Sequence, residues 1–439
     1  MKKIIWIIVI VLIVFGFYWF FFAMNSSQNG GGGIGSLKSL FPFGASNNNS
    51  TGAIPNSAAP SQNGNGGSQT AAPYDPLAQL SARAAVGMTV LASNYYSPVQ
   101  IIASSTAVSS SSTPVSVTST ATNPFLGDTL PVVRFAEHGT GYIYDVDARG
   151  KNETKKTGTT IVRVAEAYFG DDGNSVVFRY LKNDNQTIET YVGKIIPPAG
   201  VGQFGTVVGN FLPENIPNLV MSPDGTSLAY LFPTNEGVAG ISIKTDGTGK
   251  KQLFSSSFDE WLLDWKQGGM TATTKAAGDI PGYSYSVLAT GIFQKIIGGI
   301  NGLTTNISPD GRLLLYDTSG KNSLTLFMRH QNGDSTKLDV STLPEKCVWN
   351  KTSTTVYCAV PISLDSTLTY PDAWYQGLTS FQDTIWKIDA NSGNATQVSD
   401  LEGKQIDAEN LMLDPSENFL FFQNKNDGTL WSYDLRPVQ

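Results

Sequence analysis

The sequence predicts an all-β domain that is preceded by one membrane-spanning helix and a disordered linker. Three observations predict this organisation: an unbroken apolar stretch at the N-terminus, a long Gly/Ser/Asn-rich segment after it, and short β-rich runs from about residue 73 onward. These runs hold β-branched and aromatic residues and are bounded by Gly, Asp, Asn and Pro, a composition typical of strands joined by turns. Short strands in regular succession indicate a sandwich, a barrel or a propeller.

The N-terminus has the features of an uncleaved signal anchor. Ile4–Ala23 is apolar throughout, and as a helix rising about 1.5 Å per residue it is long enough for a hydrocarbon core of about 30 Å. Lys2 and Lys3 precede the stretch and no Lys or Arg follows before Lys38. The positive-inside rule therefore keeps residues 1–3 cytoplasmic and places the rest outside. A cleaved signal peptide is the alternative, but its apolar region normally ends at small residues, whereas aromatic residues end this one.

Residues 24–72 are predicted to form a disordered linker. Their Gly, Ser, Asn and Gln residues cannot bury enough apolar surface to offset the entropy of the chain. A coil of this kind has an end-to-end distance of about 35 to 40 Å. The linker would therefore hold the β domain, residues 73–439, away from the membrane surface, in the periplasm or on the cell surface.

The composition excludes several classes of function. The net charge is −7 with 15% charged residues, which is unlike the basic surface of a nucleic-acid-binding protein. Two cysteines and two histidines are too few for a four-cysteine zinc site or for most histidine-built metal sites. We therefore expect no nucleic-acid partner, no metal and no cofactor.

Internal repeats favour the propeller among the all-β folds. The motif S-P-D-G occurs at Ser222–Gly225 and Ser308–Gly311, with degenerate versions at Asp414–Asn418, Gly170–Asn174 and Trp349–Ser353. In such a hairpin turn Pro sets φ, Asp accepts local backbone hydrogen bonds and Gly supplies a positive φ. An apolar strand precedes each turn and two or three strands follow it. Units of four strands at intervals of roughly 40 to 60 residues describe propeller blades.

Counting the units predicts seven blades and the way in which the ring closes. The last unit ends after its third strand, near Leu435. The segment Leu77–Ser81 has the pattern of the missing fourth strand, so the N-terminal end of the domain would complete the last blade. Six blades are the alternative if the first unit is irregular. The first strands are expected near these residues: Ala85, Val164, Asn218, Phe258, Leu303, Glu345 and Ala408.

The repeats also resemble those of a known family. The S-P-D-G hairpin, followed by an aromatic strand and an x-W/Y-x-x-D strand, is similar to the WD-repeat-like propeller repeats of TolB-type proteins. The resemblance covers about residues 75–439, and the full motif stands at Ser222–Gly225 and Ser308–Gly311. It implies a β-propeller, here attached to an N-terminal signal anchor.

The two cysteines are predicted to form a disulfide bond. A hairpin that turns at Lys351–Thr354 pairs Val348 with Tyr357, and therefore Cys347 with Cys358. Opposed residues of an antiparallel pair have Cα atoms about 4.5 to 5.5 Å apart, which a disulfide can bridge. An extracytoplasmic location permits this bond. Two buried free thiols are the alternative.

One segment departs from the repeat pattern and is the candidate binding site. Between the second and third strands of the sixth unit, Leu364–Phe381 is longer than a hairpin turn and rich in aromatic residues. Tyr370, Asp372, Trp374 and Tyr375 are the candidate binding residues, because aromatic side chains on a loop often anchor a partner. The alternative is that these aromatic residues fold back and cover the hydrophobic core.

These features predict a noncatalytic scaffold of the bacterial envelope that binds a protein, a peptide or cell-wall material. No catalytic motif is convincing. Gly200–Gly205 matches G-x-G-x-x-G but has neither the strand before it nor the helix after it that a dinucleotide site needs. The alternative function is an extracytoplasmic hydrolase or lyase with its site in the propeller channel. The scarcity of clustered His, Cys and acidic residues favours binding over catalysis.

Overall fold

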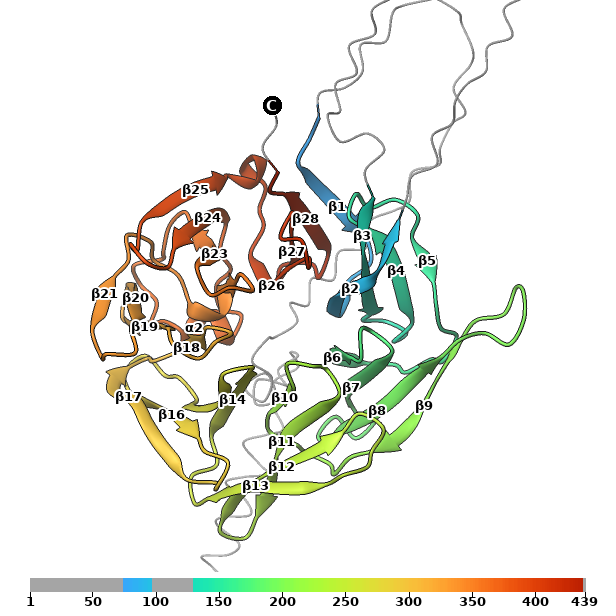
Figure 1. The fold of residues 1–439 in the computed structure, drawn as a ribbon, viewed down its shortest axis with the longest axis horizontal. Coiled ribbons are helices and arrows are strands. Elements are labelled where there is room, and N and C mark those ends of the chain that lie inside the picture. The colour runs from blue at the N-terminus through green and yellow to red at the C-terminus, as the bar shows by residue number, and fades with distance from the viewer. Residues whose placement is uncertain (1–73, 97–128, 437–439) are drawn as a thin grey trace, which may run out of the picture. The chain divides into compact units, whose positions relative to one another are not determined.

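The described strands form a ring of seven sheets, each with four antiparallel strands (Figure 1). The structure is a computed structural model, and it describes residues 74–96 and 129–436. The predicted all-β, seven-bladed β-propeller is confirmed. Within the described ranges, no helix has the length and apolar character that a membrane span requires. The predicted anchor, Ile4–Ala23, and the predicted linker, residues 24–72, lie outside the described residues.

Six blades consist of four consecutive strands. Blade 1 holds β2 (Ala85–Tyr96), β3 (Leu130–Glu137), β4 (Ile143–Asp147) and β5 (Thr154–Lys155), and blade 2 holds β6 (Val164–Gly170), β7 (Ser175–Leu181), β8 (Ile188–Ile196) and β9 (Thr206–Phe211). Blade 3 holds β10 (Leu219–Met221), β11 (Ser227–Thr234), β12 (Gly237–Lys244) and β13 (Lys251–Ser256), and blade 4 holds β14 (Trp261–Lys266), β15 (Gly269–Thr274), β16 (Pro281–Val287) and β17 (Phe293–Asn301). Blade 5 holds β18 (Thr305–Ile307), β19 (Leu314–Gly320), β20 (Ser323–Arg329) and β21 (Ser335–Lys337), and blade 6 holds β22 (Cys347–Trp349), β23 (Thr355–Pro361), β24 (Asp383–Asp389) and β25 (Ala395–Ser399).

Blade 7 joins the two ends of the described chain. It holds β26 (Ala408–Leu413), β27 (Phe419–Asn424) and β28 (Leu430–Asp434), and its fourth strand is β1 (Leu77–Ser81), which pairs with β28. This is the closure that the sequence predicted. A salt bridge between Arg149 and Asp434, 2.6 Å long, ties blade 1 to the same seam. Closure leaves no blade without its fourth strand, which protects the backbone groups of β28 from pairing with other chains.

The predicted turns connect the first and second strands of their blades and also join neighbouring blades. In blade 3 the Ser222 hydroxyl accepts a hydrogen bond from the Ser227 amide at 2.9 Å, and Asp224 accepts one from the Thr226 amide at 3.1 Å. Gly225 has φ +67°, a conformation that favours glycine. Its carbonyl accepts the Asp171 amide of blade 2 at 2.9 Å. The S-P-D-G turn is thus also a contact between blades.

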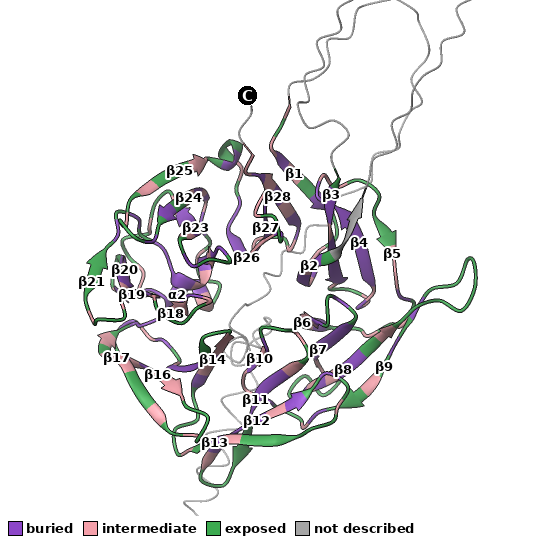
Figure 2. Cartoon of the chain, viewed as in Figure 1, coloured by how far each residue is buried: buried purple, intermediate pink, exposed green. Residues whose placement is uncertain are grey.

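The hydrophobic core lies between neighbouring sheets. Between blades 2 and 3, for example, Val177 and Val192 pack in one buried cluster with Leu228 and Tyr230. Figure 2 shows buried residues on the strands within the ring and exposed residues on many of the connecting loops. First strands of neighbouring blades contact one another, so β2, β22 and β26 come together on the inner side of blades 1, 6 and 7.

The predicted disulfide is present in blade 6. Cys347 of β22 lies opposite Cys358 of β23, and Val348 lies opposite Tyr357, in the predicted register. The two sulfur atoms are bonded, and the Cα atoms are 4.0 Å apart. Both cysteines are buried in a cluster that also contains Trp349. The bond therefore fastens the innermost strand of blade 6 to its neighbour.

Candidate binding site

The predicted binding segment lies between β23 and β24 and packs onto the ring. It contains a short helix, α2 (Asp372–Tyr375), which the sequence analysis did not predict. Tyr370 and Trp374 are fully buried, and both belong to a hydrophobic cluster with Phe381. The Trp374 and Phe381 rings are nearly parallel, with centroids 6.0 Å apart. Figure 2 shows α2 as largely buried.

The polar residues of this segment also bind the ring. The Asp372 carboxylate accepts a hydrogen bond of 2.6 Å from the Gly278 amide of blade 4. The Tyr375 hydroxyl donates to the carboxylate of Glu345. These contacts and the burial of Tyr370 and Trp374 agree with the alternative interpretation, in which the aromatic residues fold back and cover the hydrophobic core. A binding role for the four candidate residues stays a prediction.

A network of buried charges lies beneath α2. The Lys346 ammonium group, which is fully buried, is 2.9 Å from Asp383 and also donates to Asp407. It makes a further hydrogen bond of 2.8 Å to the Ala408 carbonyl. The second Asp407 oxygen accepts the Trp374 indole N–H at 2.8 Å. The helix is therefore attached to a salt-bridge network that spans blades 6 and 7.

Burial and attraction oppose each other in this network. Burial alone would lower the pKa of Lys346, but the attraction of Asp383 and Asp407 outweighs it and raises that pKa. For Asp383, burial raises the pKa to about 6, although Lys346 favours the charged form. The charged form of Lys346 is thus stabilised by Asp383 and Asp407 and not by solvent. Removing one partner from a buried pair is normally costly because it leaves an uncompensated charge.

A second pair lies close to this network. Glu409 and Lys425 are both largely buried, and burial raises the pKa of Glu409 to about 7 and lowers that of Lys425 to about 8. The Lys425 ammonium group donates to the Trp374 carbonyl at 2.6 Å and lies 3.5 Å from the centroid of the Trp374 ring. Asp407 and Lys425 of blade 7 therefore both bind Trp374 of α2.

A buried acid lies on the blade 5 side of α2. Asp317 accepts hydrogen bonds of 2.7 and 2.8 Å from the amide and hydroxyl of Thr304. Burial, and then the nearby negative charge of Glu345, raise the pKa of Asp317 to about 8. Burial likewise raises the pKa of Glu345. At neutral pH Asp317 is therefore largely protonated.

No local pattern in the sequence marks Lys346, Asp383 and Asp407 as a group. Each stands at the start of a strand: Lys346 directly before β22, Asp383 at the first position of β24, and Asp407 directly before β26. Strand starts of this kind meet at one edge of the ring when the blades are aligned. Aligning the predicted units could therefore have brought the three residues together.

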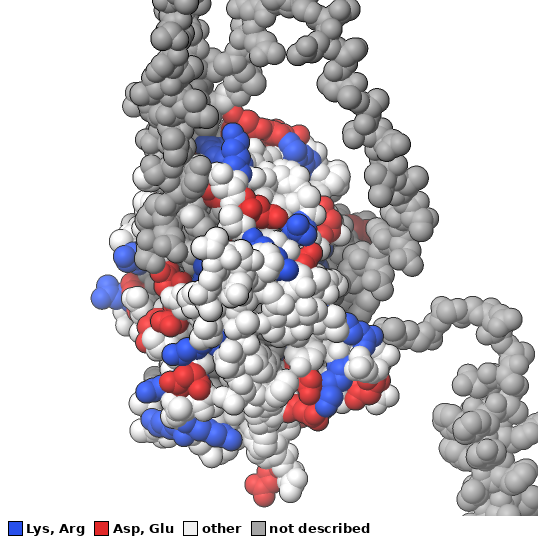
Figure 3. Space-filling model, turned by 90° about the vertical axis from the view of Figure 1, so that its right-hand side faces the viewer, with Lys and Arg blue, Asp and Glu red and all other residues white. Residues whose placement is uncertain are grey.

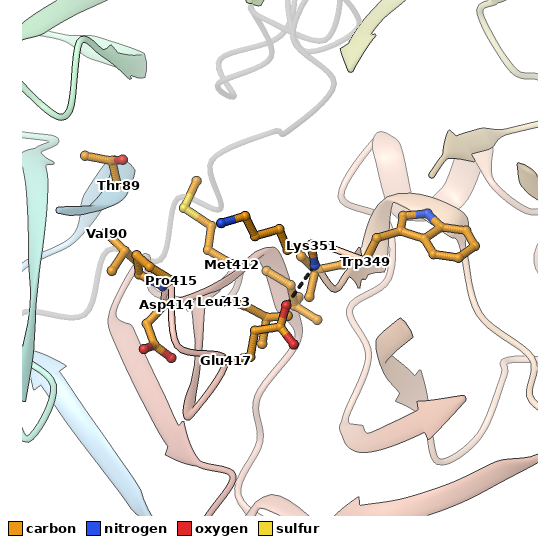
Figure 4. Close-up of a pocket in the computed structure, with 11 residues that line it drawn as sticks. Thr89, Val90, Trp349, Lys351, Met412, Leu413, Asp414, Pro415 and Glu417 are labelled. Atoms are coloured by element: carbon orange, nitrogen blue, oxygen red, sulfur yellow. Dashed lines mark hydrogen bonds between the residues drawn. The ribbon is translucent and has the colours of Figure 1, made fainter. Parts of the chain in front are cut away.

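A pocket lies where the inner strands of blades 1, 6 and 7 meet; we call it the inner-strand pocket (Figure 4). Its volume is about 360 Å³, within the range of small-molecule sites, roughly 300 to 1,000 Å³. Strands β2, β22 and β26 and the turns that follow β22 and β26 supply its lining. The lining residues are Thr89, Val90, Val348, Trp349, Lys351, Leu411, Met412, Leu413, Asp414, Pro415 and Glu417.

The carboxylates of the inner-strand pocket are engaged by the turns that carry them. Asp414 accepts the amides of Asn418 and Phe419, both at 2.7 Å. Glu417 accepts the Lys351 amide at 2.8 Å, a contact between blades 6 and 7 that Figure 4 marks. These acids therefore shape the wall of the pocket, and its apolar residues offer a surface for a ligand.

The two histidines of the chain and the Gly200–Gly205 motif are not among the residues that line this pocket. His138 is exposed in the turn after β3, and His330 follows β20 in blade 5. Gly200–Gly205 belongs to the loop between β8 and β9. In the described part of the chain, no three His, Cys, Asp or Glu side chains are grouped so that they could hold a metal ion.

No protein-family model matches the sequence, and no curated protein matches it. Among solved structures, TolB from Acinetobacter baumannii is 12% identical with a TM-score of 0.37, over 59% of this chain and 60% of its own. The match thus spans less than two thirds of the TolB chain. The β-propeller domain of Myceliophteria thermophila Cps50 (Swd1) is 11% identical over 69% and 93%, with a TM-score of 0.42.

An oligogalacturonate lyase in complex with manganese is 10% identical with a TM-score of 0.42, over 70% of this chain and 85% of its own. Identities this low concern the fold alone.

Proposed function

We propose that this chain is a noncatalytic binding protein of the bacterial envelope. A signal anchor at Ile4–Ala23 would hold it in the membrane, with the propeller outside. The propeller would bind an envelope protein, a peptide or a cell-wall fragment in the inner-strand pocket. This proposal differs from the sequence-based expectation in its choice of surface, because Tyr370 and Trp374 are buried beneath the segment that carries them.

The proposal rests on the lining of the inner-strand pocket, in which apolar side chains form the walls, the two acids are bound to backbone amides and one lysine is exposed. Apolar side chains such as Met412 and Val90 form its walls, and apolar walls with few polar groups are typical of ligand pockets. Asp414 and Glu417 already accept hydrogen bonds from backbone amides. Lys351 lines the same pocket and is exposed, so a ligand with an acidic group would find a cation there.

The test reverses the one positive charge of the pocket lining without changing its apolar wall. The full chain in mild detergent is used to capture partners from solubilised envelope, as the wild type and as Lys351→Glu. The matched control is Lys337→Glu, the same change on the exposed outer strand β21. We expect Lys351→Glu to reduce the specific capture at least about tenfold, and Lys337→Glu to leave it unchanged.

Equal capture by the wild type and both variants would contradict a role for the pocket. Both lysines are exposed, and surface substitutions usually change stability by less than about 0.5 kcal/mol. Unfolding midpoints of the three proteins, measured by circular dichroism, check that loss of capture is not loss of fold.

A further inference from the structure

An uncharged hairpin extends from the outer side of blade 2. It joins β8 to β9, and Figure 1 shows it reaching beyond the ring. Between Lys194 and Glu214 the sequence contains no charged residue. Val201 at the tip is fully exposed, and Phe204 and Val208 are 52% and 60% exposed. Exposed apolar side chains gathered in this way normally mark a contact with a protein or a membrane.

Lysines surround the base of this hairpin. The Lys155 ammonium group is 4.7 Å from the centroid of the Phe204 ring. The Lys156 carbonyl accepts the Gly205 amide at 2.9 Å, which fixes the strand of these lysines beside the hairpin. Lys194 is exposed and lies opposite Val208 in the pairing of β8 with β9. The hairpin thus has apolar side chains at its tip and lysines near its base.

Acidic groups near this base have cationic partners, and Asp246 has Lys194 itself and Lys244 among its neighbouring charges. Lys156 pairs with Asp145 at 3.5 Å, and Asp145 also pairs with Arg134 at 2.7 Å. Glu214, which ends the uncharged stretch, pairs with Lys182 at 2.8 Å. The side of the ring from which the hairpin extends faces the viewer in Figure 3, and its middle is a band of uncharged side chains with charges of both signs around it.

The shape and chemistry of the hairpin fit a lipid surface better than a protein partner. Its first half contains Pro197 and Pro198, which have no N–H to donate, so strand addition along that half is disfavoured. The tip protrudes, with its apolar side chains on the outside. Apolar residues that enter the interface, with lysines near anionic headgroups, are the two contributions that hold peripheral segments on membranes.

We propose that the β8–β9 hairpin inserts Val201 and Phe204 into the interface of an anionic phospholipid membrane. Lys155 and Lys194 would lie near the headgroups. The propeller would then contact the membrane at a second point besides the proposed N-terminal anchor, and the hairpin would orient the ring relative to the bilayer. The inner-strand pocket is built from blades 1, 6 and 7, so this surface and the pocket can be tested separately.

The test places an environment-sensitive fluorophore on the hairpin of the full chain. The chain has two cysteines, and they form the disulfide, so Val201→Cys supplies a unique thiol. The matched control is Ile292→Cys, in the corresponding β16–β17 loop of blade 4, where the side chain is 61% exposed. Both proteins are reconstituted into vesicles that contain anionic phospholipid, with or without lipids that carry a quencher at the interface.

We expect the label at residue 201 to shift to an apolar spectrum and to be quenched by the quencher lipids, whereas the label at residue 292 stays in water. Adding Phe204→Ser to the labelled protein should lower the ratio of lipid-bound to water-exposed label about tenfold, because one aromatic side chain fewer enters the lipid interface. Adding Lys194→Gln should lower it about fivefold in anionic vesicles and leave it unchanged in vesicles of neutral lipid.

Identical, water-like spectra at residues 201 and 292 would overturn the proposal. So would a label at residue 201 that is shielded but not quenched by lipid. In that case, shielding that disappears on dilution of the protein in the vesicles would assign the hairpin to contact with a second copy of the chain. Because Val201 and Ile292 are exposed, neither labelled variant is expected to unfold.

Discussion

The ammonium group of Lys346 is fully buried between the carboxylates of Asp383 and Asp407. We expect Lys346→Met to lower the free energy of unfolding by about 3 to 5 kcal/mol, because two buried carboxylates lose their cation. Adding Asp383→Asn and Asp407→Asn should restore at least half of that loss, since the charges that need compensation are then gone. Urea unfolding of the variants measures both effects.

The control for this prediction is Lys182→Met. Lys182 also pairs with two carboxylates, those of Glu189 at 3.2 Å and Glu214 at 2.8 Å, but on the surface. Exposed pairs of this kind contribute at most about 1 kcal/mol. If Lys346→Met cost no more than Lys182→Met, the buried network would not stabilise the ring.

Asp317 should make the stability of the propeller depend on pH. Burial raises its pKa from 3.8 to about 8, so the folded state binds this proton more tightly than the unfolded chain does. Its contribution is therefore complete below about pH 4 and is lost as the pH rises toward 8. Over that interval one such group lowers the free energy of unfolding by up to about 1.4 kcal/mol per pH unit.

The variant Asp317→Asn isolates this effect, because it keeps an acceptor for the Thr304 amide but cannot ionise. We expect it to be stabilised relative to the wild type at pH 7.5 and to match it more closely at pH 5, by urea unfolding. An equal difference at both pH values would mean that Asp317 does not titrate in this range.

At the scale of elements, α2 and its loop act as a cover that is fastened to blades 4, 5, 6 and 7; the Tyr370 amide, for example, donates to the Gly320 carbonyl of blade 5 at 3.0 Å. Asp372 contacts blade 4, Tyr375 contacts Glu345 of blade 6, and Trp374 donates to Asp407 of blade 7. The double change Trp374→Ala and Tyr375→Ala should lower the free energy of unfolding by about 3 to 5 kcal/mol, as for other buried aromatic residues. Thermal and urea unfolding measure this loss.

Leu378→Ala in the same loop is the control, because Leu378 is 67% exposed and should change the free energy of unfolding by less than about 0.5 kcal/mol. Should the double variant be as stable as this control and yet lose a captured partner, the aromatic residues would be binding anchors as the sequence first indicated. The two readings thus give opposite results in one pair of experiments.

At the scale of the molecule, β1 closes the ring. Leu77 and Leu80 of this strand are buried, and burial of a leucine contributes about 1.5 to 3 kcal/mol. A chain that begins at residue 74 keeps the strand, whereas one that begins at residue 82 loses it. We expect the shorter chain to be less stable by at least about 3 kcal/mol in urea unfolding. Equal midpoints would mean that β1 does not hold the ring closed.

The sequence contained much of this architecture because each blade repeats local signals. S-P-D-G turns and alternating apolar residues act over a few residues, so the turns, the blade number, the β1 closure and the Cys347–Cys358 pair could be predicted. Lys346, Asp383 and Asp407 are far apart in sequence, and only the ring brings them together. The burial of Trp374 and the inner-strand pocket depend on the same long-range packing, so local patterns did not reveal them.

The central functional claim is that the inner-strand pocket receives a partner, and site-specific photocrosslinking tests it most directly. A photoreactive residue replaces Met412, which lines the pocket, in the full chain in its native envelope. The control replaces Leu288, which is 40% exposed in the β16–β17 loop. We predict a discrete intermolecular adduct after illumination from position 412 and none from position 288. No adduct at 412, or the same adduct at both positions, would contradict the account.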